Sequence, residues 1–425
     1  MNKKKESKVV PNVRFKGFTD DWKQRKLGEL LISLQNNTLS RAELSDELGV
    51  AKNIHYGDVL IKFGNVLDVS KERFPMISDE GVLEKYKESF LKNGDVIVAD
   101  TAEDSTVGKC SEISGLNDEV VLSGLHTIPY RPIEKFAFGY LGYYLNSSAY
   151  HDQLIPLMQG IKVTSISKSA MKDTEIVYPK SVEEQGKVAE YFRNLDRLIT
   201  LHQQKITLLT KLKKAMLEKM FPKKGSVIPE FRFNGFANAW EQRKLGEITD
   251  VRDGTHDSPK YVQEGHPFIT SKNVSNGFIN YDDVQYVTDA DYEEINKRSK
   301  VDVHDILMGM IGTIGNLALI LKEPDFAIKN VALIKYTGDV DYQYLYQALQ
   351  AGCVTNQLST GMDGGTQKFV SLKKIRELDI PFPDGWEQRK IGTYFSTLDH
   401  LITLHQRKLD MLKNLKSACL SEMFI

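Results

Sequence analysis

The sequence has few cysteines and no long apolar run. Its three cysteines, Cys110, Cys353 and Cys419, are widely spaced along 425 residues, which argues against a disulfide framework or a zinc site of paired cysteines. No stretch approaches the roughly 20 apolar residues that a membrane span needs. The basic N-terminus, MNKKKESKVV, lacks the apolar segment of a secretory signal. We therefore expect a cytoplasmic protein that has no membrane segment and holds no metal ion.

Signatures of stand-alone enzymes are also missing. Gly108-Lys109 and Gly186-Lys187 lack the upstream glycine and the following hydroxyl of a phosphate-binding loop. The glycines at 309, 312 and 315 have the wrong spacing for a nucleotide loop and favour a turn. No HExxH, Gly-x-Ser-x-Gly or Asn-Pro-Pro-aromatic motif occurs. The sequence therefore predicts a chain that performs no catalysis by itself.

An excess of positive charge is also lacking, since 56 Lys and Arg stand against 57 Asp and Glu. This balance argues against a strongly basic nucleic-acid binder. Positive charge is concentrated in residues 181–224, which carry ten basic side chains and five acidic ones. A polyanion would therefore be bound through local patches, and a partner would share the phosphate contacts.

The chain contains an internal repeat. Residues 11–30 (PNVRFKGFTDDWKQRKLGEL) and 229–248 (PEFRFNGFANAWEQRKLGEI) are identical at twelve of twenty positions. Residues 191–221 and 394–424 are identical at 18 of 31 positions. Between these anchors the two halves align only loosely. Like ends and unlike middles indicate one scaffold, used twice to display two different surfaces.

The second repeated segment predicts a long helix in each half. Neither copy contains Gly or Pro, and apolar residues recur every three or four positions. Thirty-one residues would form a rod of about 46 Å, and its apolar stripe must be covered, most simply by the other copy. The residues expected at this helix–helix interface are Ile199, His202, Ile206, Leu209, Met216, Ile402, His405, Leu409, Leu412 and Met423.

Four polar residues interrupt these stripes at equivalent positions. His202 and His405 lack ligand-type neighbours three or four residues on, so an interface histidine is favoured over a metal or catalytic residue. Lys213 and Lys416 occupy a second pair of equivalent positions. The exposed lysines of the first helix are interpreted as a solvated face, with contact to DNA as the alternative.

The remainder of each half is predicted to be a strand-rich domain. Short β-type runs are separated by Gly, Asn and Asp turns, and Ser167 and Ser371 are expected to cap short helices. The predicted fold is α+β, with two pseudo-symmetric domains separated by two long helices that form an antiparallel coiled coil. The expected boundaries are domains at 1–180 and 224–383 and helices at 181–223 and 384–425.

Exposed polar turns are the candidates for contact with nucleic acid. In Gly254–Tyr261, polar side chains can meet base edges and Lys260 can meet phosphate, although an ordinary surface turn explains the segment equally well. Glycine-containing tips and the starts of two short helices add further candidates. The complete set is Gln159, Lys162, Thr164, Lys168, Thr255, His256, Asp257, Ser258, Lys260, Tyr261, Gln367, Lys368 and Lys373.

The order of these segments resembles the specificity subunit of type I restriction-modification systems. The resemblance rests on Pro-x4-Glu-Gln-x-Lys-Val at 179–188, its repeat at 383–391, the Trp-x-Gln-Arg-Lys-Leu-Gly-Glu openings at Trp22 and Trp240, and the Gly-Thr-His-Asp-Ser-Pro turn. It covers nearly the whole chain. The first domain lacks a clear Gly-Thr-His-type turn, which leaves its DNA-facing loop unassigned.

The resemblance implies a non-catalytic subunit that reads double-stranded DNA. Two target-recognition domains would recognise the unlike halves of a bipartite, asymmetric site. The helices would act as a spacer and dock two methyltransferase subunits, and restriction subunits would join them. S-adenosylmethionine, ATP and Mg are then expected in the partner subunits, with no cofactor in this chain.

The length of the predicted helices agrees with this function. Major-groove half-sites on one face of DNA lie about 34–36 Å apart, which a rod of about 46 Å can span. The alternative is a coiled-coil scaffold that binds proteins without reading DNA. Sequence-selective binding to a duplex would distinguish the two.

Overall fold

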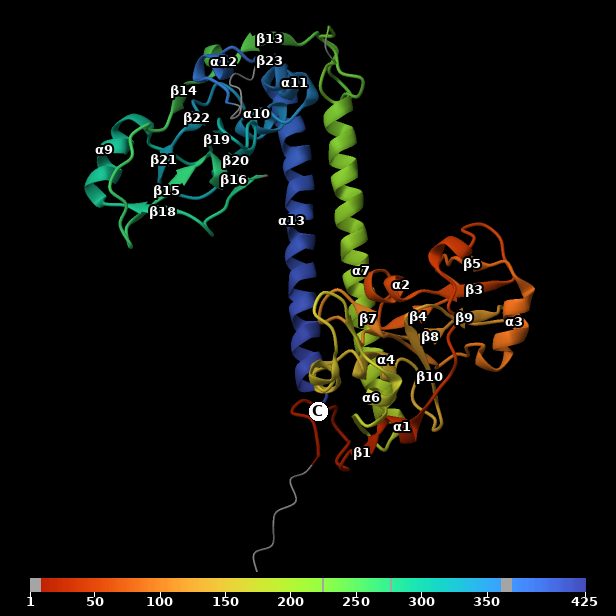
Figure 1. Cartoon of the computed structure of the whole chain (residues 1–425). Coiled ribbons are helices and arrows are strands. Elements are labelled where there is room, and N and C mark those ends of the chain that lie inside the picture. Colours follow the sequence, from red (N-terminus) through yellow and green to blue (C-terminus); the bar gives the residue numbers. More distant parts are fainter. Residues whose placement is uncertain (1–8, 224, 276, 361–368) are drawn as a thin grey trace, which may run out of the picture. The chain divides into compact units, whose positions relative to one another are not determined.

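The computed structural model describes residues 9–223, 225–275, 277–360 and 369–425, which form two compact units. Unit 1 contains residues 9–202 and 408–425 of the described chain, and unit 2 contains the described residues of 203–407. The long helices are α7 (Val182–Lys219) and α13 (Gly385–Glu422). Each unit consists of an α+β head and one segment of both long helices (Figure 1). The division between the units thus falls inside the helices.

The head of unit 1 contains a five-stranded sheet in the order β2-β10-β6-β8-β4 and a three-stranded sheet in the order β5-β3-β9. Two short ladders, β1-β12 and β7-β11, join distant segments. The strands are β1 (Lys23–Lys26), β2 (Leu31–Ser33), β3 (Ala51–Ile54), β4 (Val66–Asp68), β5 (Met76–Ile77), β6 (Val96–Ala99), β7 (Thr101–Ala102), β8 (Cys110–Ser114), β9 (Val121–Ser123), β10 (Thr127–Pro132), β11 (Thr164–Ser165) and β12 (Glu175–Tyr178). The helices are α1 (Leu27–Leu30), η1 (Arg41–Glu43), α2 (Tyr56–Ile61), α3 (Glu80–Tyr86), η2 (Lys87–Ser89), α4 (Tyr140–Tyr144), α5 (Ser148–His151), η3 (Ile155–Leu157) and α6 (Lys168–Lys172).

The head of unit 2 contains a four-stranded sheet in the order β14-β22-β19-β20 and a three-stranded sheet in the order β18-β15-β21. The ladder β13-β23 corresponds to β1-β12, and β16 pairs with β17. The strands are β13 (Glu241–Lys244), β14 (Val251–Asp253), β15 (His266–Thr270), β16 (Val274–Ser275), β17 (Phe278–Ile279), β18 (Gln285–Val287), β19 (Ile306–Gly309), β20 (Leu317–Leu319), β21 (Ala327–Lys329), β22 (Val331–Ile334) and β23 (Asp379–Phe382). The helices are α8 (Leu245–Ile248), α9 (Asp289–Ser299), η4 (Ser271–Asn273), α10 (Tyr342–Ala348), α11 (Gly352–Thr360) and α12 (Leu372–Arg376).

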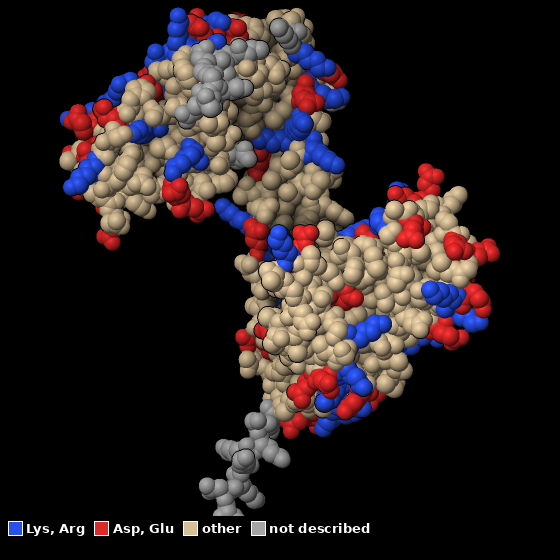
Figure 2. Space-filling view, viewed as in Figure 1, with Lys and Arg blue, Asp and Glu red and all other residues tan. Residues whose placement is uncertain are grey.

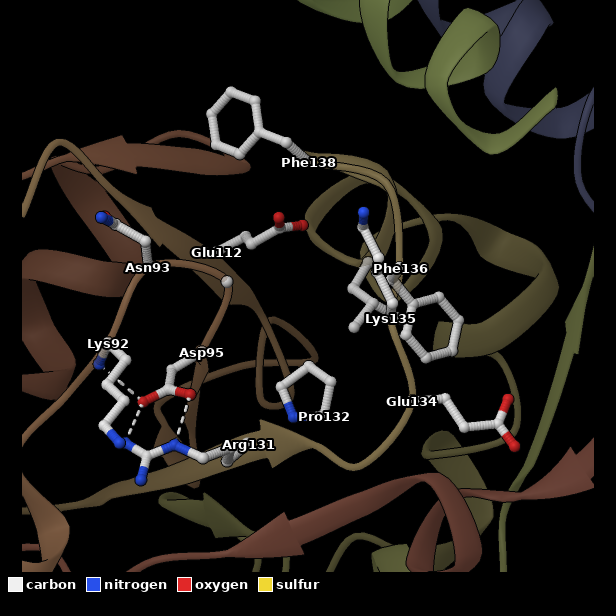
Figure 3. Close-up of a pocket in the computed structure, with 12 residues that line it drawn as sticks. Lys92, Asn93, Asp95, Glu112, Arg131, Pro132, Glu134, Lys135, Phe136 and Phe138 are labelled. Atoms are coloured by element: carbon white, nitrogen blue, oxygen red, sulfur yellow. Dashed lines mark hydrogen bonds and ion pairs between the residues drawn. The ribbon is translucent and has the colours of Figure 1, made fainter. Parts of the chain in front are cut away.

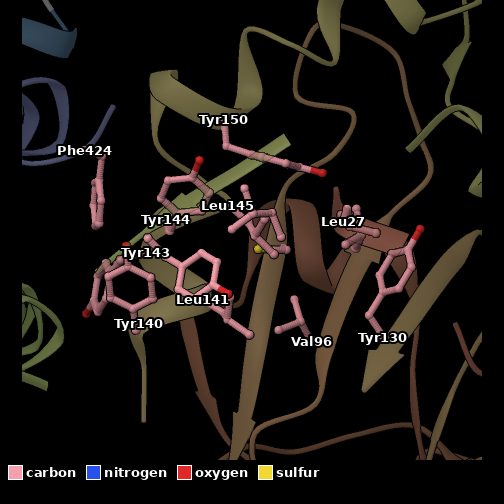
Figure 4. Packing of buried hydrophobic residues seen from close by; sticks show 14 of the residues in the cluster. Leu27, Val96, Tyr130, Tyr140, Leu141, Tyr143, Tyr144, Leu145, Tyr150 and Phe424 are labelled. Atoms are coloured by element: carbon pink, nitrogen blue, oxygen red, sulfur yellow. The ribbon is translucent and has the colours of Figure 1, made fainter. Parts of the chain in front are cut away.

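The central strands of both heads are covered on both faces. All positions of β6 and β19 are buried. Val96 and Val98 pack into one core cluster and Ile97 into another, because successive strand residues point to opposite faces. The first cluster also holds the tyrosines of α4, which gather near Phe424, two residues beyond the end of α13 (Figure 4). Ser167 and Ser371 cap α6 and α12 as predicted, since each side chain accepts a backbone N–H three residues on.

The repeated opening motif has a structural explanation in each unit. In unit 1, Arg14 and the indole N–H of Trp22 both bind the carboxylate of Glu184, which is 2% exposed. Arg232, Trp240 and Glu387 form the same arrangement in unit 2. The Glu of the Pro-Glu-Gln-Lys motif therefore ties the start of each long helix to the opening segment of its own head.

The two helices run antiparallel within each unit. In unit 1, Phe192 stacks on Phe424, and the hydroxyl of Tyr191 shares a hydrogen bond with Sγ of Cys419. In unit 2, Phe221 contacts Phe395. In both units a residue near the start of one helix meets a residue near or just beyond the end of the other, as the predicted antiparallel pairing requires.

The ten residues expected between the helices follow one less exposed stripe on each helix. Ile199, His202, Ile206, Leu209 and Met216 are half-buried on α7. Leu409 and Leu412 of α13 and Met423, directly after it, are buried, and Ile402 and His405 are half-buried. Among the described helices, none is long and apolar enough to cross a membrane.

The two interrupting lysines pair with aspartates of the other helix. Lys213 Nζ lies 2.7 Å from Asp399 within unit 2, and Lys416 Nζ lies 2.6 Å from Asp196 within unit 1. Only 14% and 20% of the lysine side chains are exposed. Lys213 is thus part of the helix–helix contact, and not of a solvated or DNA-facing surface.

Candidate nucleic-acid interface

Polar turns lie together at one end of the four-stranded sheet of unit 2, which we call its main sheet; the main sheet of unit 1 is the five-stranded one. Strands β14 and β19 end there, and β20 and β22 begin there, because neighbouring strands of this sheet are antiparallel. We call residues 254–261, 310–316 and 329–330 the loop edge of unit 2. It contains the Gly-Thr-His turn and the glycine-rich turn at 309–315, which is a turn as predicted.

A close backbone approach holds the Gly-Thr-His turn against the end of β21. A Cβ atom on Gly254 would lie 2.4 Å from the carbonyl oxygen of Ile328, so only glycine fits without a shift. The N–H of Thr255 donates to the same carbonyl, and the N–H of Asn330 donates to the carbonyl of Thr255. The side chains after Thr255 therefore project from a backbone that is fixed on both sides.

His256 is held between two oxygen acceptors. Its Nδ1 lies 2.7 Å from Asn330 Oδ1, and its Nε2 lies 2.9 Å from Asp253 Oδ2. These hydrogen bonds, first to Asn330 and then to Asp253, raise the pKa of His256 above its usual value. Arg298 also binds Asp253. His256 is 63% exposed, so it presents a positioned, readily protonated ring to solvent.

The other predicted residues of this turn are largely solvent-accessible. Asp257, Ser258, Lys260 and Tyr261 are exposed, and Thr255 is half-buried. Ser258 is bonded by Lys329, a residue that the sequence did not single out. The turn and α9 border a shallow hollow.

Ser271 connects the other turns of this edge. Its hydroxyl donates to the carbonyl of Asn330 and accepts the backbone N–H of Met310. Asn330 itself adopts a left-handed backbone (φ 51°), as does His126 at the corresponding place in unit 1 (φ 55°). In each head a polar residue stands at the turn that enters the strand next to the central one, β10 in unit 1 and β22 in unit 2.

The loop edge of unit 1 comprises residues 34–38, 100–107, 126 and 159–165. Where unit 2 has Gly-Thr-His, the chain of unit 1 continues from β2 into Asn36 and Asn37. Asn37 is fully buried and donates to Asn53 and to the carbonyl of Ser123. The two edges therefore have the same framework and different side chains.

His126 is the exposed counterpart of Asn330. Its ring lies edge-on to Tyr56 at 5.3 Å, and its Nδ1 is 3.4 Å from Asp100. Sequence reasoning missed His126, Asn330 and Asp253, because their partners are brought together only by the sheet. The sequence signal for His126 and Asn330 was a His or an Asn in a short turn between two apolar runs, since these residue types adopt a left-handed backbone more often than most.

The tip at 159–165 holds three of the four predicted residues of unit 1, and Lys168 begins α6. Gln159 and Ser165 exchange two backbone hydrogen bonds, and the turn projects Lys162 into solvent. Thr164 is half-buried and pairs with β7. Lys168 is exposed but donates to the carbonyl of Leu34, and burial lowers its pKa.

Lys373 lies on α12, which is distant in sequence from the Gly-Thr-His turn. Its Nζ is 3.9 Å from the carboxylate of Glu377. Gln367 and Lys368 lie outside the described residues.

Basic and acidic side chains are interspersed on the visible faces of the two units (Figure 2). The candidate interface therefore has local donors, acceptors and single cations, and the visible faces carry no continuous basic surface.

The chain thus has two α+β heads with the same arrangement of opening segment and helix start, and each head is joined to one segment of the same antiparallel helix pair. This arrangement defines a duplicated recognition scaffold. The family model of the type I restriction modification DNA specificity domain matches residues 19–211 and 238–414, most of the chain. The chain belongs to this family of type I restriction-modification specificity subunits, and its fold is the α+β arrangement predicted above.

Two relatives come from Methanocaldococcus jannaschii. The type I restriction enzyme MjaVIII specificity subunit is 23% identical over 61% of this chain and 63% of that subunit, so less than two thirds of its length is matched. The putative type I restriction enzyme MjaX specificity subunit is 24% identical over 93% of this chain and 91% of that subunit.

Solved structures show the same fold. The S subunit of a type I restriction-modification system from M. genitalium gives a TM-score of 0.62 at 15% identity, covering 98% of this chain and 99% of that chain. A chain from a structure of complex assembly in a type I R-M system gives a TM-score of 0.50 at 16% identity, covering 94% and 96%.

Proposed function

We propose that this chain reads a bipartite, asymmetric site on double-stranded DNA, with one half contacted by the loop edge of each unit. The observation that carries the proposal is the use of one frame twice with unlike loop edges. His256 and Asn330 stand where unit 1 has other side chains, among them His126. Different donors and acceptors recognise different base edges, so the two half-sites would differ.

The exposed apolar side chains of the helices support docking of two methyltransferase subunits. In unit 1, Leu198, Leu201, Met411 and Leu415 are each more than 40% exposed. Unit 2 exposes Leu208 and Leu404 at 67% and 52%. Exposed apolar side chains grouped on helices are typical of protein-binding surfaces. Each unit thus has its own candidate docking surface.

The partners would supply the chemistry. Methyltransferase subunits would bind S-adenosylmethionine, and restriction subunits would bind ATP and Mg, while this chain performs no catalysis. The near-neutral charge of this chain supports this division. A chain without excess positive charge leaves phosphate contacts for its partners to contribute. The expected location is the cytoplasm.

Exchange of one head tests the proposal. Replacing residues 30–180 by the same segment of another family member should change one half of the methylated site and leave the other half and the gap unchanged. Sequencing of methylated positions in cells that carry the assembled complex gives the result. A change in both halves or in neither would contradict separate reading, and the absence of sequence-selective binding would favour the scaffold alternative.

Shortening the helices tests their proposed role as a spacer. A matched deletion of two turns from α7 and α13, about seven residues each, removes about 10 Å and keeps the apolar stripes in register. The gap between the methylated half-sites should shorten by about three base pairs. An unchanged gap would show that the helices do not set it.

A further inference from the structure

A hollow of about 410 Å³ opens in unit 1 at the end of the main sheet opposite the loop edge. Glu112 and Phe138 line it (Figure 3), and so do Gly94 and Leu141. Gly94 has a left-handed backbone (φ 90°), and a Cβ atom built there would meet nothing within 4 Å. The space next to Gly94 is therefore open.

Glu112 places a carboxylate at the buried side of this hollow. The side chain belongs to the fully buried strand β8, and its two oxygens accept the backbone N–H groups of Gly139 and Gly142 at 2.6 and 3.0 Å. Burial raises the pKa of Glu112 to about 7. The backbone N–H of Leu141 also acts on this carboxylate. A carboxylate has about four lone-pair sites, so after three backbone donors it can accept one more hydrogen bond.

Phe138 provides an aromatic wall. Its side chain is 44% exposed, and the Arg193 guanidinium lies 4.7 Å from the ring centre. The exposed part of the ring can stack on a further planar group.

The same place in unit 2 is identified by a pair of equivalent aspartates. Asp95 and Asp305 are each 1% exposed and precede the central strand of their head. Asp95 pairs with Arg131 of the neighbouring strand β10 at 2.7 Å, and Asp305 pairs with Lys335, directly after the neighbouring strand β22, at 2.6 Å. The residues immediately before them, Gly94 and His304, therefore occupy equivalent positions.

His304 fills in unit 2 the space that Gly94 leaves open in unit 1. Its backbone is also left-handed (φ 76°), and its N–H donates to Ile320 as that of Gly94 donates to Ile113. The imidazole stacks on Tyr342, with ring centres 3.9 Å apart and planes at 9°. In unit 2 this position is thus occupied by a nitrogen heterocycle that belongs to the chain itself, the imidazole of His304.

The carboxylate of Glu112 has no counterpart at the equivalent position of unit 2. Glu112 directly precedes Ile113, so its counterpart directly precedes Ile320 and is Leu319. Phe138 corresponds to Tyr342, because the preceding residue in each head donates its N–H to the glutamine of the repeated helix motif. Unit 1 thus combines an empty ring position with a buried hydrogen-bond acceptor.

We propose that this hollow is a binding site for a small, flat nitrogen heterocycle that stacks on Phe138 and donates an N–H to Glu112. The ligand takes the place that the imidazole of His304 takes in unit 2. The site is separate from the DNA-reading function proposed above, because it lies at the other end of the sheet.

Indole and N-methylindole are matched probes, because they differ in the N–H group. Ligand-observed NMR titration of the full chain should show saturable binding of indole, with at least tenfold weaker binding of N-methylindole. Gly94→His should abolish indole binding by filling the hollow, and Phe138→Ala should weaken it at least tenfold. Phe231→Ala, which removes a phenylalanine of unit 2 that is 53% exposed, is the control and should change nothing.

A gain of binding provides an independent test. His304→Gly should open a second hollow that binds both probes equally, because Leu319 accepts no hydrogen bond. The proposal is overturned if the unaltered chain shows no saturable binding of indole, if the two probes bind it equally, or if Gly94→His leaves binding intact in a folded protein. If Gly94→His fails to fold, Phe138→Ala decides. Unchanged stoichiometry in His304→Gly would contradict the equivalence of the two hollows.

Discussion

Lys416 of α13 and Asp196 of α7 form an ion pair of 2.6 Å inside the helix–helix contact of unit 1. The aspartate also accepts the hydroxyl of Tyr143, and so connects both helices to the head. In unit 2, Lys213 and Asp399 form the equivalent pair. A polar pair inside an apolar stripe favours the register in which both partners meet.

Removal of one partner should therefore destabilise unit 1. Loss of one partner from a fully buried pair costs about 3–5 kcal/mol. Asp196 is 35% exposed, so solvent screening reduces the expected cost of Lys416→Met to about 1–2 kcal/mol. Urea denaturation measures the change. Lys413→Met, at an exposed position of the same helix, is the control, and an equal effect of both variants would refute the special role of Lys416.

The buried carboxylate of Glu184 should contribute more. Glu184→Ala leaves Arg14 without its ion-pair partner and the indole N–H of Trp22 without its acceptor. The free energy of unfolding should fall by about 3–5 kcal/mol. Glu183→Ala removes a neighbouring glutamate that is 72% exposed and should change stability by less than about 0.5 kcal/mol. A similar loss in both variants would argue against the proposed tie between helix and head.

Gly254→Ala should impair DNA reading by unit 2. The added methyl group would lie 2.4 Å from the carbonyl oxygen of Ile328 and push the Gly-Thr-His turn away from β21. We expect at least a tenfold weaker affinity of the assembled complex for its site, measured by fluorescence anisotropy. Gly352→Ala has open space around the new methyl group and should retain the original affinity. Retained affinity in Gly254→Ala would remove this turn from the interface.

The affinity for DNA should depend on the protonation of His256. Hydrogen bonds to Asn330 and Asp253 raise its pKa, Arg298 opposes them, and the ring carries a positive charge below that raised pKa. Its attraction to phosphate is therefore complete at low pH and is lost as the pH rises through a value above 6.5. His256→Gln should bind more weakly at pH 6 and flatten this part of the pH profile. An unchanged profile would show that the imidazole does not face the nucleic acid.

Glu112 should make the stability of unit 1 fall with rising pH. Its pKa in the folded chain is raised to about 7, from 4.5, so the folded state binds more protons than the unfolded state between these values. Stability therefore declines as the pH rises through this window, by a few kcal/mol at most. Urea denaturation at several pH values should show a smaller decline for Glu112→Gln. Identical slopes would contradict the raised pKa.

The exposed edges of the heads were only partly predictable. Gly254–Tyr261 could be singled out because glycine, proline and small polar residues mark a turn in any fold. His256 could not be assigned its partner, because Asn330 lies 74 residues away and reaches it through sheet pairing. In unit 1 no motif marks Asn37 or His126, and their positions follow from the same sheet.

The sequence by itself determined the duplicated frame, the two long helices and the stripe along which they pair. Helical periodicity and repetition are local properties of a chain, and they survive without knowledge of its folded form. The tertiary structure alone decided that Lys213 and Lys416 meet aspartates, that Glu184 and Glu387 hold the opening segments, and which side chains share a loop edge. These contacts join residues far apart in sequence, and their partners are selected by sheet order and helix register.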